Sequence, residues 1–312
     1  MRAYVVKEFG VPGAIEDRED LSPSAGDVVV TVRAAGVNAM DVGVVAGLMK
    51  DFLEHRLPLI PGLDLSGVVR SVGDGAGWKA GDEVFGIADK PFMGEGTFAE
   101  QVAVQAASLV AKPLELDHAQ AAALPTASLT ALSAVNEAGV QNGQTIVVLG
   151  ATGGVGSFAV QLAAMRGARV VAVTKSDYGA YARELGASDV IDYTQGDVAA
   201  AIRAKAATID AVVDFAGDTA LLDSLAPLVR NGGSVISAAA MLDPEAYKAK
   251  GLVGKSIRRA PVASLNEIVD LIREKKLRLP AVRLLPLERA ADALAEQSQR
   301  HVKGKLVLEV AK

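Results

Sequence analysis

The stretch Thr145–Ala168, which reads T-I-V-V-L-G-A-T-G-G-V-G-S-F-A-V-Q-L-A-A-M-R-G-A, decides the fold. A short apolar run leads into a knot of glycines at Gly150–Gly156, and a helical pattern begins at Ser157. Glycines let the chain turn sharply and let backbone N–H groups approach a pyrophosphate, which the N-terminus of the following helix also attracts. The stretch therefore indicates a dinucleotide-binding turn, with an ordinary strand-to-helix turn as the alternative.

The residues after this stretch alternate between strand and helix patterns, which favours the dinucleotide interpretation. Strands are expected at 145–149, 169–174, 189–191, 211–215 and 234–238, and helices at 157–166, 177–185, 198–205 and 220–229. Strands that alternate with helices form a parallel sheet covered on both faces, and runs such as A-V-V-D-F suit strands buried on both sides. We therefore predict an α/β fold with a Rossmann doubly wound parallel sheet.

The two ends of the chain show other patterns of strands and helices. Short strand patterns broken by glycine turns occur at 3–7, 27–33, 66–72 and 97–104, which is typical of a β-rich domain. An Ala- and Leu-rich helical pattern starts at Asp117, and the tail carries helices at 265–275 and 287–296 and a strand at 305–310. Because 312 residues exceed what one compact core usually holds, we expect two domains.

Composition excludes several classes of function. The net charge is −5 and the basic residues are scattered, so we expect no nucleic-acid partner. No apolar run approaches the ~20 residues of a spanning helix and the start lacks the apolar block of a signal peptide, which predicts a cytoplasmic location without membrane contact. The chain has no cysteine and only three histidines, His55, His118 and His301, so a zinc site or a thiol nucleophile is not expected.

The end of the second strand of the alternating region indicates which nicotinamide cofactor is bound. NAD sites usually place Asp or Glu there, about 20 residues after the glycines, to bind the ribose 2′-hydroxyl. This chain has Val173-Thr174-Lys175-Ser176 instead, and a hydroxyl and an ammonium suit a 2′-phosphate. NADPH is therefore the expected cofactor, with a solvated loop lysine as the alternative role of Lys175.

Further motifs resemble those of one family along nearly the whole chain. They are A-A-G-V-N-A-M-D (34–41), P-L-I-P-G-L-D-L-S-G-V-V (58–69), G-W-K-A-G-D-E-V-F-G (77–86), G-T-F-A-E (96–100), A-L-P-T-A-S-L-T-A (123–131), E-L-G-A-S-D-V-I-D-Y (184–193) and H-V-K-G-K-L-V-L (301–308). The chain resembles the medium-chain dehydrogenase/reductase superfamily, specifically its zinc-free, zeta-crystallin-like quinone oxidoreductase branch. Zinc-dependent relatives carry Cys or His where this chain has Gly36-Val-Asn, and Gly-His-Glu where it has Gly62-Leu-Asp.

The resemblance implies domains and site residues. A GroES-like, partly open β-barrel catalytic domain would comprise 1–122 and 263–312, and a Rossmann NADP(H)-binding domain 123–262. The resemblance assigns Asn38 beside the nicotinamide as the catalytic residue, with Thr130 nearby at a helix start. The remaining cofactor-binding residues would be Thr152, Gly153, Gly154, Val155, Gly156, Thr174, Lys175, Tyr193, Phe215, Gly217, Ser237, Ala238, His301 and Lys303. Tyr193 as a core aromatic, and His301 and Lys303 as a surface turn, are the alternatives.

The resemblance implies hydride transfer from NADPH to a quinone or an α,β-unsaturated carbonyl without a metal. The Asn38 amide and the Thr130 hydroxyl would donate to the acceptor oxygen or hold the nicotinamide carboxamide. The sequence shows no Ser/His/Asp set, and no side chain is assigned as the general acid. The proton would therefore come from water or a cofactor hydroxyl. The chain departs from many quinone reductases at Val42–Met49, where they carry a Y-I-R-S-G segment. An apolar pocket at Met49 and Leu63 is a hypothesis, and core packing is the alternative.

Two other functions stay open. One is a metal-free alcohol dehydrogenase, although a general base is not evident. The other is an NADPH-binding regulatory or structural protein with little turnover. In either case the sheet edge near Ser234–Leu252 is a template for pairing with a second copy, so a homodimer is expected from the resemblance.

Overall fold

The computed structural model describes residues 1–311 and divides into two compact units. The first unit comprises Met1–Thr126, Pro261–Asp270 and the residues from Ala281 onward, and the second comprises Ala127–Ala260 and Leu271–Pro280. The chain therefore leaves the first unit and returns to it. Among the described residues, no helix is long and apolar enough to cross a membrane.

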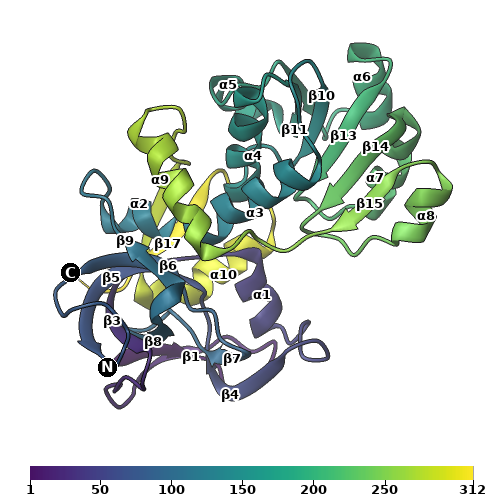
Figure 1. The fold of residues 1–312 in the computed structure, drawn as a ribbon. Coiled ribbons are helices and arrows are strands. Elements are labelled where there is room, and N and C mark those ends of the chain that lie inside the picture. Colours follow the sequence, from purple (N-terminus) through teal and green to yellow (C-terminus); the bar gives the residue numbers. More distant parts are fainter. Residues whose placement is uncertain (312) are drawn as a thin grey trace. The chain divides into compact units, whose positions relative to one another are not determined.

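The second unit is built on a six-stranded, wholly parallel sheet with the order β12-β11-β10-β13-β14-β15. Figure 1 shows these strands side by side with helices around them. The strands are β10 (Thr145–Leu149), β11 (Arg169–Thr174), β12 (Asp189–Asp192), β13 (Ile209–Asp214), β14 (Val229–Ser237) and β15 (Val253–Ser256). From β10 the chain adds β11 and β12 on one side of the sheet, and then β13, β14 and β15 on the other side. The boundary between β10 and β13 is therefore the topological switch point of a doubly wound fold. The predicted Rossmann architecture is confirmed.

The helices of this region are α3 (Pro125–Glu137), α4 (Gly154–Met165), α5 (Gly179–Glu184), α6 (Val198–Lys205), α7 (Thr219–Leu225) and α8 (Pro244–Ala249). The apolar residues of β10, Ile146–Leu149, are fully buried because helices cover both faces of the sheet. The side chains of Asp197 and Asp218 cap α6 and α7 by accepting from backbone N–H groups in the first turn. Helix α4 begins at Gly154, three residues before the predicted start.

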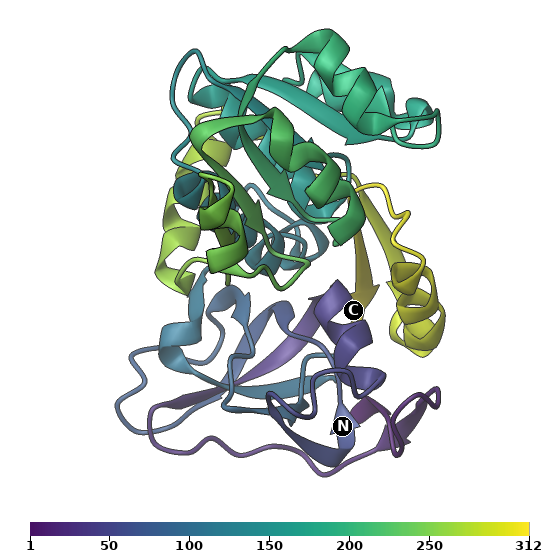
Figure 2. The ribbon, with the colours of Figure 1, turned by 90° about the vertical axis from the view of Figure 1, so that its right-hand side faces the viewer.

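The first unit contains a seven-stranded sheet with the order β16-β17-β3-β5-β6-β9, in which β8 also pairs with β3. Its strands are β3 (Asp27–Gly36), β5 (Asp64–Val72), β6 (Glu83–Ile87), β8 (Gln101–Gln105), β9 (Leu109–Ala111), β16 (Val282–Pro286) and β17 (Lys305–Glu309). Two small sheets accompany it, β1 (Arg2–Val5) with β2 (Ala14–Asp17), and β4 (Glu54–Ile60) with β7 (Phe92–Glu95). Figure 2 shows the purple and blue strands of this unit together with the yellow strand from the C-terminal end of the chain. This is the predicted GroES-like domain.

The other α-helices of residues 1–311 are α1 (Ala39–Val45), α2 (His118–Ala122), α9 (Leu265–Arg273) and α10 (Ala290–Ser298). Helix α1 was not expected, because Val42-Gly-Val-Val combines glycine with β-branched residues that disfavour helix. Tertiary packing overrides this preference, since α1 lies against α10 and buries Asp41 and Val44.

Candidate functional site: a glycine loop and a buried polar cluster

The glycine loop at the carboxyl end of β10 has the backbone of a phosphate cradle. Gly150 has φ +71°, and Gly153 is the N-cap of α4, whose first turn holds Gly154 and Gly156. A Cβ added at Gly156 would lie 2.1 Å from the Gly150 carbonyl oxygen, so only glycine allows the helix to start this close to the loop. With Thr152 and Val155 between these glycines, the loop fits the pyrophosphate of a dinucleotide at a helix N-terminus.

A hydroxyl pair fastens this loop to the end of the next strand. The Thr152 and Thr174 hydroxyl oxygens lie 2.5 Å apart, and the two residues are only 4% and 3% exposed. Thr174 therefore holds the loop with its hydroxyl, and Lys175 and Ser176 lie on the turn that follows it.

A carboxylate that the sequence analysis did not single out stands at the end of β12. Asp192 is level with Thr174 in the parallel ladder, and its carboxylate accepts from the Ser176 N–H at 3.0 Å and the Thr194 N–H at 2.8 Å. Hydrogen bonds from Ser176 and then Thr194 hold the pKa of Asp192 far below its ordinary value. The following residue, Tyr193, is 39% exposed, so the alternative of a core aromatic is wrong.

A second carboxylate orders the loops beyond β13 and β14. Asp214 is fully buried and accepts from the Gly217 N–H at 3.0 Å and from the Ser237 hydroxyl at 2.6 Å. The Ser237 oxygen in turn accepts from the N–H groups of Ala239 and Ala240. Ser237 is fully buried and thus shapes the loops, whereas Ala238 is exposed and Phe215 and Gly217 are half-buried at the carboxyl edge of the sheet.

Thr130 does not lie at a helix start, which corrects the expectation from the sequence. It is the sixth residue of α3, and the helix begins at Pro125 because Asp64 accepts from both the N–H and the hydroxyl of Thr126, at 3.0 and 2.6 Å. A carboxylate at this position stabilises the exposed N–H groups of the first turn. The start expected at the S-L-T-A motif is too late, because proline favours the first position of a helix and Pro125 occupies it here.

Asn38 belongs to a buried polar cluster of the first unit. Its side-chain oxygen accepts from Lys305 Nζ at 2.6 Å, and its Nδ2 donates to Asp64 Oδ2 at 3.0 Å. Lys305 Nζ also donates to the Val37 carbonyl at 2.9 Å and lies 3.6 Å from Asp64. Asp41 accepts from the Asn38 N–H at 2.7 Å. All five residues are at least 92% buried, since Asn38 at 8% is the most exposed.

The charges of this cluster shift two pKa values. Burial, with the nearby Asp64 carboxylate, raises the pKa of Asp41 to about 7. Burial also lowers the pKa of Lys305, although Asp64 and Asp41 oppose that shift.

The cluster does not fit a metal ion. Asn38 Oδ1 and the Val37 carbonyl, which lie in the segment where zinc-dependent relatives carry a ligand, already accept from the Lys305 ammonium. Leu63 offers no donor at the second such position. Within residues 1–311, no group of three or more His, Cys, Asp or Glu side chains could hold a metal ion.

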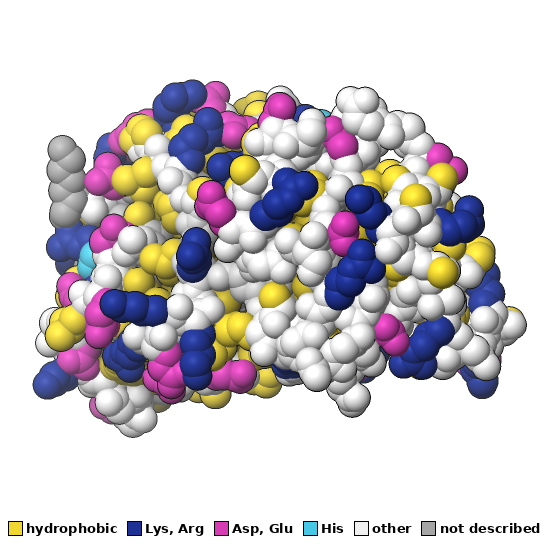
Figure 3. All heavy atoms as spheres, turned by 90° about the horizontal axis from the view of Figure 1, so that it is seen from above, with side chains coloured by type: hydrophobic (Ala, Val, Ile, Leu, Met, Phe, Trp, Pro, Cys, Tyr) yellow, Lys and Arg dark blue, Asp and Glu magenta, His cyan; other side chains and the backbone are white. Residues whose placement is uncertain are grey.

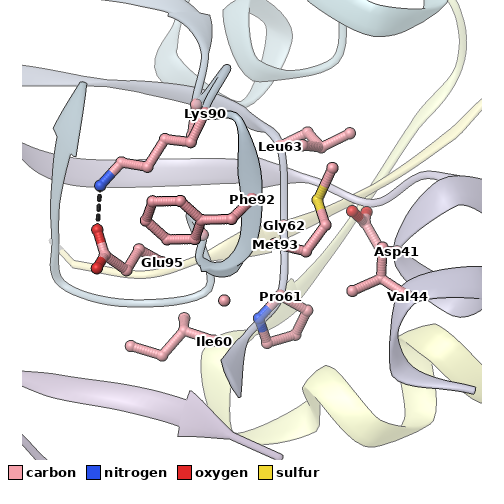
Figure 4. A pocket seen from close by; sticks show the side chains of 13 residues that line it. Asp41, Val44, Ile60, Pro61, Gly62, Leu63, Lys90, Phe92, Met93 and Glu95 are labelled. Atoms are coloured by element: carbon pink, nitrogen blue, oxygen red, sulfur yellow. Dashed lines mark hydrogen bonds and ion pairs between the residues drawn. The ribbon is translucent and has the colours of Figure 1, made fainter. Parts of the chain in front are cut away.

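Asp41 also lines a pocket of the first unit. Its other lining residues include Val44, Leu63, Phe92 and Met93. Figure 4 shows the Asp41 carboxyl group on the same side as the Met93 side chain, with the Lys90–Glu95 ion pair beyond Phe92. The pocket is therefore mainly apolar, with the carboxyl groups of Asp41 and Glu95 and the ammonium of Lys90 also in its lining. Leu63 lines it as hypothesised, whereas Met49 is not among its lining residues and Met93 is.

His301 and Lys303 lie in the turn between α10 and β17, both exposed. His301 lines a shallow groove with Arg283 and Arg289, whose guanidinium groups pair with Glu296 and Asp292. Figure 3 likewise shows basic and acidic side chains interspersed over one face of the molecule. Nothing in this groove forms a dedicated anion site.

The structure brings together a Ser–His–Glu line that the sequence did not reveal. Ser66 Oγ lies 2.8 Å from His118 Nδ1, and His118 Nε2 lies 3.5 Å from Glu83. The Ser66 hydroxyl is fully buried and donates to the Val84 carbonyl at 3.1 Å, so it is not placed to attack a substrate. This line fixes α2 against the sheet.

Sequence reasoning missed Asp41, Asp64, Asp192, Asp214 and Lys305. All five lie within stretches quoted above, for example Lys305 in H-V-K-G-K and Asp192 in V-I-D-Y. Of the candidate residues, Asn38, His301 and Lys303 belong to the first unit and the others to the second.

Comparisons with known families and proteins agree with this architecture. A family model described as "Alcohol dehydrogenase GroES-like domain" matches residues 24–114, and one described as "Zinc-binding dehydrogenase" matches residues 185–308. The "Chloroplast envelope quinone oxidoreductase homolog" of Arabidopsis thaliana is 32% identical over 304 residues, which cover 92% of this chain and 91% of that protein.

Two further relatives are named for different nicotinamide cofactors. The "NADPH-dependent alkenal/one oxidoreductase, chloroplastic" of Arabidopsis thaliana is 30% identical over 322 residues, covering 99% of this chain and 79% of that protein. A solved structure named "NAD-dependent alcohol dehydrogenase" has a TM-score of 0.90 and 31% identity, and each chain is covered completely.

Proposed function

Because the chain belongs to the medium-chain dehydrogenase/reductase superfamily, in its quinone oxidoreductase branch, we propose that it reduces a quinone or an α,β-unsaturated carbonyl with NADPH and without a metal. The glycine loop between β10 and α4 carries this proposal, because it fits a dinucleotide pyrophosphate at the switch point of the sheet. Quinone and alkenal reductases among the relatives support the class of acceptor.

The second unit would hold the cofactor. Backbone N–H groups of Thr152–Gly156 would bind the pyrophosphate, and Lys175 and Tyr193 would lie beside the adenosine ribose. The ordered loops after β13 and β14, with Phe215, Gly217 and Ala238, would line the nicotinamide half. Bound NADPH supplies the hydride, so this chain contributes binding and orientation. NADPH is proposed as the cofactor from Lys175, a cation on the turn where a 2′-phosphate would lie.

Asn38 is proposed as the polar group beside the nicotinamide. Lys305 holds its oxygen and Asp64 holds one hydrogen of its Nδ2, while its second hydrogen has only the Gly36 carbonyl at 3.5 Å. That weakly engaged hydrogen is the one available for donation to an acceptor oxygen or to a carboxamide. The cluster thus orients Asn38, and its role is a positioned hydrogen-bond donor.

The acceptor would be largely apolar. Leu63, Phe92 and Met93 line the pocket of the first unit, and apolar pockets with few polar groups suit small unsaturated carbonyls and quinones. The missing Tyr–Arg pair at Val42–Met49 removes polar specificity, so a range of acceptors is expected.

The test is the loss of NADPH absorbance with a small ortho-quinone and with a medium-chain 2-alkenal, each repeated with NADH and with a chelator present. Turnover that survives the chelator supports the proposal, and the faster acceptor identifies the substrate class. A Gly156→Ala variant is the matched control, because it removes the phosphate cradle and should abolish turnover with either acceptor.

Two alternatives have distinct outcomes in the same test. Alcohol-driven reduction of NAD(P)⁺ would favour a metal-free alcohol dehydrogenase. Tight NADPH binding without turnover on either acceptor would favour a binding protein.

We also propose a homodimer formed at the edge strand β15, where Val253 is 53% exposed, and a cytoplasmic location. Gel filtration with light scattering tests the homodimer, and localisation of the tagged protein tests the location.

A further inference from the structure

Opposite charges stand on neighbouring strand ends of the second unit. Strand β11 ends at Thr174, directly before Lys175, and strand β12 ends at Asp192. The parallel register places Thr174 level with Asp192, so both ends reach the same edge of the sheet. In doubly wound folds, ligands bind beyond this edge. A carboxylate of the adjacent strand therefore lies beside the turn after β11.

Hydrogen bonds fix the Asp192 carboxylate on this edge. Oδ2 accepts from the Ser176 N–H at 3.0 Å, and Oδ1 accepts from the Thr194 N–H at 2.8 Å and the Thr194 hydroxyl at 2.7 Å. These donors favour the ionised form, so the carboxylate is a permanent negative charge. The Ser176 N–H is already donated to Asp192, which leaves that group unavailable to a phosphate.

The charges on this turn do not favour a 2′-phosphate as clearly as the sequence suggested. Lys175 is half-buried and forms no ion pair with any residue from 1 to 311, whereas Asp177 on the same turn is an exposed acid. A phosphate monoester carries between one and two negative charges near neutral pH, and a ribose hydroxyl carries none. Asp192 would therefore repel a 2′-phosphate that Lys175 attracts, and it would act little on a 2′-hydroxyl.

We propose that Asp192 is a specificity-determining residue that limits the preference for a 2′-phosphorylated dinucleotide, so that the protein accepts NADH as well as NADPH. The inference rests on the proposed function, because it requires that the second unit binds a dinucleotide. Lys175 then favours the 2′-phosphorylated dinucleotide and Asp192 disfavours it. Removing the charge of Asp192 should raise the ratio of NADP⁺ affinity to NAD⁺ affinity, and removing the charge of Lys175 should lower it.

The experiment is calorimetric titration of the full chain with NADP⁺ and with NAD⁺, which needs no turnover. Asp192→Asn keeps the shape and an acceptor oxygen, and it should bind NADP⁺ roughly three- to tenfold more tightly while NAD⁺ affinity changes less than about twofold. The gain should shrink in about 0.5 M KCl, because salt screens exposed charges. Lys175→Met should weaken NADP⁺ binding by a similar factor.

Thr194→Ala is the matched control, because it removes one hydrogen bond to Asp192 and keeps the charge. Its ratio of affinities should equal that of the wild type. An unchanged ratio in Asp192→Asn, or equal weakening of both ligands, overturns the inference and assigns Asp192 to holding the turn. Asp192→Ser repeats the test if the asparagine lowers the melting temperature.

The proposed function fails in a different way. A wild-type protein that binds neither NAD⁺ nor NADP⁺ contradicts both the function and the inference. If the wild type binds both dinucleotides and reduces a quinone or an enone, but Asp192→Asn leaves the ratio of NADP⁺ to NAD⁺ affinity unchanged, the inference alone is contradicted.

Discussion

Lys305 Nζ lies 2.6 Å from Asn38 Oδ1, and this contact decides which way the Asn38 amide faces. The two residues are 267 positions apart in the chain, and the pairing of β17 with β3 brings them together. An amide oxygen that accepts from an ammonium leaves its NH₂ group to face Asp64 and the Gly36 carbonyl. A buried cation thus orients the residue that we propose as the hydrogen-bond donor of the reaction.

Lys305→Met should destabilise the protein by about 3–5 kcal/mol, because it leaves Asp64 and the oxygens of Val37 and Asn38 without their buried cation. Urea unfolding followed by circular dichroism measures the loss. Lys303→Met, two residues away and exposed, is the control and should change stability by less than about 0.5 kcal/mol. Equal effects of the two substitutions would contradict the role of the cluster.

The raised pKa of Asp41 predicts a pH-dependent stability. The folded protein holds this proton up to about pH 7, whereas the unfolded chain releases it near the ordinary value of 3.8. The stabilisation is therefore complete below about pH 4 and disappears as the pH rises through about 7. The wild type should lose stability relative to Asp41→Asn by up to about 1.4 kcal/mol per pH unit across this range. Urea unfolding of both proteins at a series of pH values measures this loss. A difference in unfolding free energy between the two proteins that stays the same at every pH would contradict the prediction.

Gly156→Ala should remove dinucleotide binding and lower the melting temperature, because the new Cβ would lie 2.1 Å from the Gly150 carbonyl oxygen and push α4 away from the loop. Fluorescence titration with NADPH should show at least a tenfold loss of affinity, about 1.4 kcal/mol or more. Gly179→Ala, in the first turn of α5, meets its nearest atom at 3.4 Å and is the control. Binding that survives Gly156→Ala would exclude the loop as the phosphate site.

Ser237→Ala should cost roughly 1–3 kcal/mol of stability, because the buried Asp214 carboxylate loses a donor and two loop N–H groups lose their acceptor. The loop after β14 should also exchange its amide hydrogens faster. Ser224→Ala is the control, since that hydroxyl donates to a carbonyl within its own helix on the surface. Hydrogen exchange by mass spectrometry follows both variants, and unchanged protection near Ala239 and Ala240 would contradict the ordering role of Ser237.

The alternating region was predictable because local signals there agree with the tertiary fold. Buried parallel strands need continuous apolar runs, and the turn into α4 needs glycines at Gly150 and Gly156, so periodicity and composition indicated the Rossmann sheet directly. Periodicity placed the start of α4 three residues late, because that helix begins at Gly154 within the glycines and has no side-chain cap. The resemblance placed Thr130 at a helix start, whereas α3 begins at Pro125, where its cap Asp64 comes from a distant strand.

The sequence by itself determined the fold class, the absence of thiol ligands and the glycine loop, since each depends on residue types at short spacing. Only the tertiary structure decided which charges share a site. Lys305 meets Asn38 through strand pairing across the chain, and Asp192 meets the turn after β11 through the register of two parallel strands. Charges act through space, and their effect on a pKa or a ligand depends on distances that chain order does not contain.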